Sequence, residues 1–144
     1  MLEPIEFEKM VQIRAYRILN NLLRYKSCVD NDCTPTLDFD INPTDRLVGI
    51  YENSISNSQS NVFISNNGVY FYRGAWQFIE YSQMQRVRVP VANNEKRNAN
   101  VLVVQTKSEE TFELQFISGT SRFADVWEVS RFFMRIIEDW NKRF

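Results

Sequence analysis

The hydrophobic positions near the N-terminus repeat with the spacing of an α-helix. Over residues 5–25, apolar side chains recur every three or four positions and so share one helical face: Phe7, Val11, Ala15, Ile18, Leu22 and Tyr25. Pro4 stands where the first helical turn tolerates a proline. The pattern predicts a helix packed on its own domain. It leaves open a helix that docks on a partner or lies on a membrane surface.

The middle of the chain changes to short runs rich in β-branched and aromatic residues. These runs predict seven strands, at 46–52, 61–65, 69–73, 76–81, 85–89, 101–106 and 111–117. The tripeptide Asn66-Asn67-Gly68 predicts a tight hairpin turn, because both central residues of such a turn need positive φ. The connections are short and parallel strands need long crossovers, so we expect an antiparallel meander.

Two further segments flank or follow these strands. Residues 26–45 are rich in Asp and contain two prolines, which predicts an irregular acidic connector. Within it Leu37, Phe39 and Ile41 alternate with polar residues, a pattern that would fit a short edge strand. Residues 121–142 carry an apolar stripe from Val126 to Trp140, which predicts a closing helix.

Seven antiparallel strands followed by one long amphipathic helix resemble the pleckstrin-homology-like (PH-like) superfold. The local match is to bacterial PH-like and GRAM-like domains, over residues 64–90, where Ile79, Tyr81, Met84 and Val87 occupy the step from one strand to the next. The resemblance implies an α+β fold, a seven-stranded antiparallel partly open barrel capped by the C-terminal helix. It assigns residues 46–144 to the PH-like domain. The extra N-terminal helix and acidic connector, residues 1–45, would pack on the same domain.

Charge and composition narrow the function classes. The 144 residues include no histidine and carry a net charge of −1, which excludes a histidine-dependent triad and argues against a protein that coats nucleic acid. The balance is uneven: residues 27–60 hold one basic and six acidic residues, and residues 61–100 hold five basic and two acidic ones. These two stretches are candidate contact surfaces for a partner.

The candidate binding residues are the five cations of the basic stretch: Arg73, Arg86, Arg88, Lys96 and Arg97. Arg86 and Arg88 alternate with valines, so we expect both to point outward from one strand. PH domains that bind phosphoinositides use Lys and Arg around the first hairpin. Here the corresponding loop, residues 53–61, has no basic residue. A solvated strand face without a ligand remains the plain alternative.

The remaining motifs do not complete a metal site or a catalytic site. Asp38-x-Asp40-x-Asn42 begins like a calcium loop, but Pro43 stands where such a loop needs glycine. Four residues separate Cys28 from Cys33, and we expect two ordinary reduced thiols, although a local disulfide is geometrically feasible. We find no catalytic set, and we expect no enzyme activity, no metal and no cofactor.

The sequence therefore predicts a non-enzymatic PH-like protein-interaction module, with a regulatory or toxin-neutralising role compatible with it. PH-like domains often bind peptides along an open edge between a strand and the C-terminal helix. The expected partner is another protein and not nucleic acid. The alternative is a peripheral domain that binds anionic lipid on a membrane surface. No apolar run approaches a membrane span or a secretory signal, so we expect a cytoplasmic protein.

Overall fold

A computed structural model describes residues 4–90, 99–117 and 124–143. Within these ranges the chain has two α-helices and eight β-strands, which makes it an α+β protein as expected. The helices are α1 (Pro4–Ile18) and α2 (Asp125–Arg143). The strands are β1 (Tyr25–Ser27), β2 (Leu47–Tyr51), β3 (Val62–Ser65), β4 (Gly68–Tyr72), β5 (Trp76–Glu80), β6 (Met84–Arg88), β7 (Val101–Thr106) and β8 (Thr111–Gln115).

The strands form two antiparallel sheets. The first has five strands in the order β1-β2-β3-β4-β5, and the second has three in the order β6-β7-β8. The seven predicted strands correspond to β2 through β8, so their existence and chain order are confirmed. β1 was not predicted, because three residues are too few to show a periodic pattern in the sequence.

The sheets do not close into a barrel in the described part of the chain, where no strand pairing joins them. A 3-10 turn at Tyr81–Gln83 separates β5 from β6 and redirects the chain between the sheets. A single buried amide bridges them elsewhere. Asn53 Nδ2 donates to Gln115 O (2.7 Å) on β8, and Asn53 Oδ1 accepts from Ile117 N (2.7 Å). A side chain thus supplies the hydrogen bonds that strand pairing would supply in a closed barrel.

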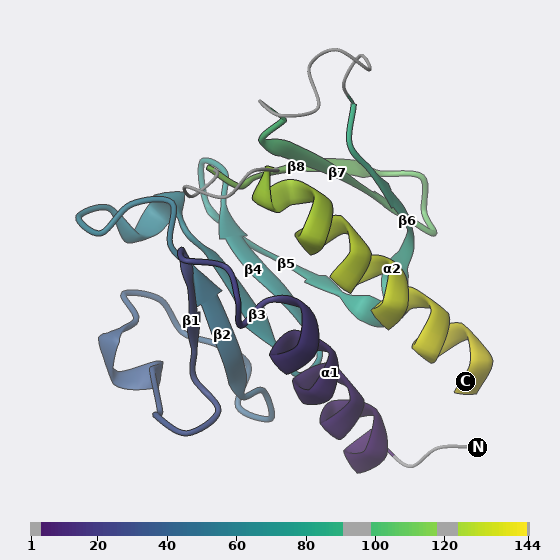
Figure 1. The fold of residues 1–144 in the computed structure, drawn as a ribbon, viewed down its shortest axis with the longest axis horizontal. Helices are drawn as coiled ribbons and strands as arrows, with labels where there is room; N and C mark the ends of the chain where they lie inside the picture. The colour runs from purple at the N-terminus through teal and green to yellow at the C-terminus, as the bar shows by residue number, and fades with distance from the viewer. Residues whose placement is uncertain (1–3, 91–98, 118–123, 144) are drawn as a thin grey trace.

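The main core lies between the sheets and the two helices. α2 runs across the sheets with α1 beside it, and α1 begins near the end of α2 (Figure 1). Phe132, Phe133 and Ile136 of α2 are fully buried. At the helix–helix contact the Phe7 ring meets Trp140 edge-on, with ring centroids 5.1 Å apart. The amphipathic stripe predicted for the N-terminal helix is therefore buried within the same core as the strands.

Two boundaries differ from the sequence prediction. The first helix ends at Ile18 and not near residue 25, because the chain then turns: Leu22 N donates to Leu19 O (2.9 Å) and Tyr25 N donates to Leu22 O (3.1 Å). Asn20 and Asn21, which are weak helix formers, lie in this turn.

The alternating stretch 37–41 is not a strand. Its apolar side chains are instead part of a second, smaller core cluster on the first sheet. Phe39 stacks on Trp76 with ring centroids 4.0 Å apart, and it meets Phe63 edge-on at 5.0 Å. The alternation therefore reflects packing of a loop against a sheet face, without a strand partner.

The hairpin between β3 and β4 is tight, as predicted, but its backbone differs from the expectation. Neither Asn67 nor Gly68 has positive φ. Ser65 Oγ holds the turn by accepting from Asn67 N (3.2 Å) and Gly68 N (3.0 Å). Glycine is needed at position 68 because an added Cβ would collide with the backbone oxygen of Ile79.

Candidate interaction surface

The structure separates the predicted basic residues. Arg73 lies in the turn between β4 and β5 and lines a hollow of about 470 Å³ between the sheets. Arg86 and Arg88 lie on β6 of the other sheet, and both are exposed as predicted, with Val87 half-buried between them. Arg86 Nε donates to Gln105 Oε1 (2.6 Å) across the strand pair. Lys96 and Arg97 lie outside the described residues.

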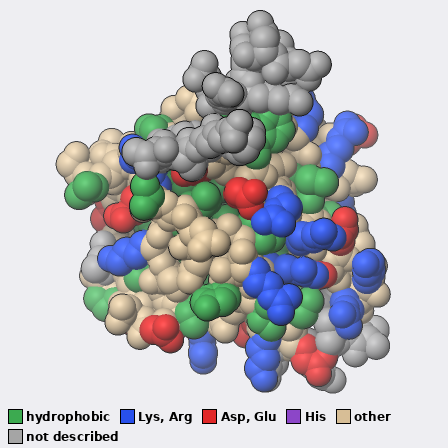
Figure 2. Space-filling view, in the orientation of Figure 1, with side chains coloured by type: hydrophobic (Ala, Val, Ile, Leu, Met, Phe, Trp, Pro, Cys, Tyr) green, Lys and Arg blue, Asp and Glu red, His purple; other side chains and the backbone are tan. Residues whose placement is uncertain are grey.

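Other cations gather on the helices. Figure 2 shows Lys and Arg side chains over the region of α1 and α2, with acidic side chains among them. Some of the helical cations are ion-paired: Arg131 contacts Glu128 (2.7 Å) and Arg135 contacts Glu138 (3.3 Å) on α2. Arg14 of α1 contacts the buried Asp139 through Nε (3.0 Å to Oδ2) and Nη2 (3.1 Å to Oδ1).

A different surface is hollowed and mostly apolar. It lies in the corner between α1 and β1, has a volume of about 440 Å³, and is called here the α1–β1 groove. Three of its apolar side chains are exposed: Ile13 (43%), Tyr16 (71%) and Val29 (49%). Large apolar side chains gathered around a hollow are typical of a contact surface for another molecule.

β1 supplies an open edge beside this groove. Among the described strands only β2 pairs with β1. Cys28 N donates to Val48 O (2.8 Å) and Glu52 N donates to Arg24 O (2.7 Å). Every second residue of this segment, in step with Arg24 and Cys28, therefore directs its backbone groups toward β2. The backbone groups of Ser27 and the carbonyl of Tyr25 therefore point away from β2, toward the edge, whereas Tyr25 N already donates to Leu22 O. An extended chain can pair with an edge of this kind.

A second hollow of about 340 Å³ adjoins the groove and is called here the acidic hollow. Both hollows share Val29 and Asp30 in their linings. The acidic hollow adds the carboxylates of Asp32 and Asp45, against one guanidinium, that of Arg46. On the α1 side the groove is lined by Ile13, Ala15 and Tyr16 together with Gln12 and Arg17, and on the side of the connector its wall is acidic.

The three carboxylates of the acidic hollow differ in their surroundings. Asp45 is buried and accepts hydrogen bonds from Tyr70 Oη (2.5 Å) and Asn67 Nδ2 (2.7 Å), so donors within the protein already bond to its carboxylate. Asp30 and Asp32 are exposed. Hydrogen bonds from the Thr34 side chain, and then from its backbone, lower the pKa of Asp32 below its ordinary value.

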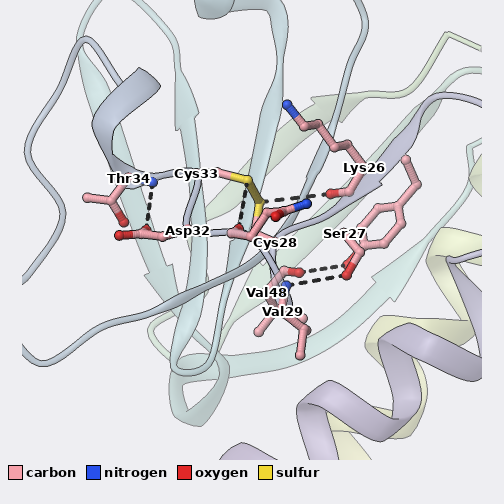
Figure 3. Close-up of a disulfide and its surroundings, with 10 residues drawn as sticks. Lys26, Ser27, Cys28, Val29, Asp32, Cys33, Thr34 and Val48 are labelled. Atoms are coloured by element: carbon pink, nitrogen blue, oxygen red, sulfur yellow. Dashed lines mark hydrogen bonds between the residues drawn. A yellow bond between two sulfur atoms is a disulfide. The ribbon is translucent and has the colours of Figure 1, made fainter.

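A disulfide joins Cys28 to Cys33 at the base of this wall (Figure 3). The expectation of two free thiols is therefore wrong. The Cα atoms lie 5.6 Å apart, within the range that a disulfide spans. The loop between the cysteines is further held where Val29 N donates to Ser27 Oγ (3.3 Å) and Thr34 N donates to Asp32 Oδ1 (2.9 Å).

The disulfide also bears on the expected compartment. Disulfides are rare in reducing compartments, so reduced thiols no longer support the cytoplasmic prediction. In the described part of the chain, no helix combines the length and the apolar character that a membrane span requires.

Neither the groove nor the acidic hollow was predicted from the sequence. One signal was present: Ile13 and Tyr16 are apolar but stand outside the helical stripe formed by Phe7, Val11 and Ala15. Among the described residues, no group of three or more His, Cys, Asp or Glu side chains is placed to hold a metal ion.

Comparisons of the chain with protein-family models, curated proteins and solved structures gave no significant match. A function for this chain therefore has to be derived from its own residues and geometry.

Proposed function

We propose that this chain is a non-enzymatic protein-interaction module on a PH-like scaffold, and that the α1–β1 groove is its contact surface. The scaffold is supported by the order of the elements: β2 to β5 pair in chain order in one antiparallel sheet, β6 to β8 do so in a second, and one long helix follows. α1, β1 and the acidic connector are additions to that scaffold, and they are the segments that form the groove.

The observation that carries the proposal is the joint presence of an apolar hollow and an open strand edge. Ile13, Tyr16 and Val29 are exposed around the hollow, and β1 has no strand partner on its outer side among the described residues. Strand addition uses both features. Main-chain hydrogen bonds to the edge give affinity, and a pocket for alternate side chains gives selectivity.

Selection from a random peptide library displayed on phage tests this function. We expect peptides enriched on the wild-type protein to bind at least about tenfold more weakly to an Ile13→Ser, Tyr16→Ser double variant, because the contact loses the burial of apolar side chains. Both side chains are exposed, so the double variant should unfold in urea close to the wild type.

Ile55→Ser is the matched control, because Ile55 is 97% exposed in the loop between β2 and β3 and does not line the groove. We expect this control to bind the selected peptides as the wild type does. A library that yields no enriched peptide, or peptides that bind the double variant and the wild type equally, would contradict the proposal.

The second candidate function is peripheral association with anionic lipid. Met134 is 51% exposed on α2 and lies between Arg131 and Arg135, an arrangement of apolar and cationic side chains that suits a membrane surface. Arg86 and Arg88 add exposed cations on β6. This candidate ranks second because Arg131 and Arg135, the two arginines that flank Met134, are ion-paired to glutamates.

A further inference from the structure

We propose that the groove takes an extended peptide segment in which an apolar anchor side chain lies close to a Lys or Arg. This inference rests on the proposed function and specifies the partner of the same surface. The apolar anchor occupies the α1–β1 groove, and the cation faces Asp30 and Asp32 in the acidic hollow.

The charge of the wall selects the cation. Asp30 lines both hollows, and Asp32 lines the acidic hollow next to it. Both are exposed, so their charges face the space that a ligand would fill. The surrounding segment carries the same sign, since residues 27–60 hold six acidic residues and one basic residue. A cationic segment would be attracted to this wall and an anionic one repelled.

Asp45 does not take part in this recognition. It is buried, and Tyr70 and Asn67 already donate hydrogen bonds to its carboxylate. Arg17 lines the groove on the α1 side, and Arg46 lines the acidic hollow. The cation of the peptide is therefore placed toward the loop between the cysteines, away from Arg17.

The loop that carries the two carboxylates is held before any ligand arrives. The Cys28–Cys33 disulfide closes it, and Asp32 accepts a hydrogen bond from Thr34 N at its end. A wall fixed in this way loses little conformational entropy on binding, so its charges can discriminate between peptides.

Three fluorescent octapeptides test the inference by anisotropy titration. All carry the same valine and phenylalanine anchors at alternate positions, and the intervening positions are Lys, Gln or Glu. We expect the wild-type protein to prefer the Lys peptide to the Gln peptide, and the Gln peptide to the Glu peptide. The preference should shrink as salt is added, because exposed charges are screened.

Asp30→Asn is the decisive variant, and Asp40→Asn is its control. Both remove one exposed carboxylate from the same connector, but Asp40 lines neither hollow. We expect Asp30→Asn to weaken the Lys peptide about two- to fivefold, as removal of one exposed ion pair does, and to leave the Gln peptide unchanged. Asp40→Asn should leave all three affinities unchanged.

The outcomes separate this inference from the proposed function. The inference is overturned if the Lys peptide binds no better than the Gln peptide, or if its advantage is undiminished in Asp30→Asn. In either case, weaker binding of all three peptides to the Ile13→Ser, Tyr16→Ser double variant would still support the groove as the contact surface. If no peptide binds, or if the double variant binds all three as the wild type does, both proposals are overturned.

Discussion

The hydroxyl of Tyr51 connects β2 with the start of α2. It lies 2.7 Å from Asp125 Oδ2 and 2.5 Å from the backbone oxygen of Ile117, and both Tyr51 and Asp125 are buried. Tyr51→Phe removes this donor from the buried Asp125 carboxylate and from the Ile117 backbone oxygen. We therefore expect the free energy of unfolding to fall by about 1–3 kcal/mol, measured by urea denaturation at neutral pH.

The same residue predicts a pH dependence. Burial first, and then the hydrogen bond with Asp125, raise the pKa of Tyr51 well above its usual value. The unfolded chain ionises this group from about pH 10, so its contribution is fully present below that pH and is lost as the pH rises further. Tyr51→Phe should therefore lose less stability above pH 10 than the wild type does.

A matched change at the surface controls for the loss of a hydroxyl. Tyr16 is 71% exposed, and Tyr16→Phe should leave the unfolding free energy within about 0.5 kcal/mol of the wild type. Equal effects of Tyr16→Phe and Tyr51→Phe would show that the Tyr51 hydrogen bonds do not stabilise the fold.

At the scale of elements, the disulfide fixes the loop that follows β1. Closing a loop of so few residues lowers the entropy of the unfolded chain, which raises its free energy by about 2 kcal/mol. We expect dithiothreitol to lower the unfolding free energy of the wild type by about that amount in urea denaturation. A Cys28→Ser, Cys33→Ser double variant should start from the lower value and show no response to dithiothreitol. An unfolding midpoint that reductant leaves unchanged in the wild type would contradict the prediction.

Element types followed from the sequence where a periodic pattern had room to repeat. Four to six residues of β-branched and aromatic character were enough to place β2 through β8, and α2 shows its stripe over several turns. β1 has three residues, too few for a pattern. The stretch around Phe39 alternates as a strand would, yet its rings pack on Trp76 and Phe63 without backbone pairing. Periodicity in the sequence indicates which side chains are buried, but it does not show whether the backbone pairs with another strand.

At the scale of the whole molecule, the sequence predicted the order of the elements but not their closure. The chain passes from one sheet to the other at one turn. Side-chain hydrogen bonds of Asn53 and Tyr51 link the two sheets, and no pattern in the chain indicates them. The groove is likewise a product of tertiary structure, because it forms only when α1 and β1 meet at an angle. Arg86 and Arg88 are exposed, as expected, but Arg73 lies in a turn of the other sheet, between β4 and β5.

The distribution of charge over the molecule predicts how it behaves toward membranes. Arg131 and Arg135 are neutralised by glutamates one turn away, and the chain as a whole carries a net charge of −1. We therefore expect the wild type to stay in the supernatant when vesicles of phosphatidylcholine with one-fifth phosphatidylserine are sedimented, even at low ionic strength, where attraction is greatest.

A variant of the same helix makes this prediction sharper. Glu128→Gln with Glu138→Gln removes the ion-pair partners of Arg131 and Arg135 beside the exposed Met134, so we expect this double variant to sediment with the anionic vesicles and to be released by salt. Vesicles of pure phosphatidylcholine should retain neither protein, because the attraction is electrostatic. One result would favour lipid binding over the peptide groove as the function of this chain. The wild type would sediment with the anionic vesicles but not with those of pure phosphatidylcholine. Salt would release it, and Arg86→Gln with Arg88→Gln would abolish the binding.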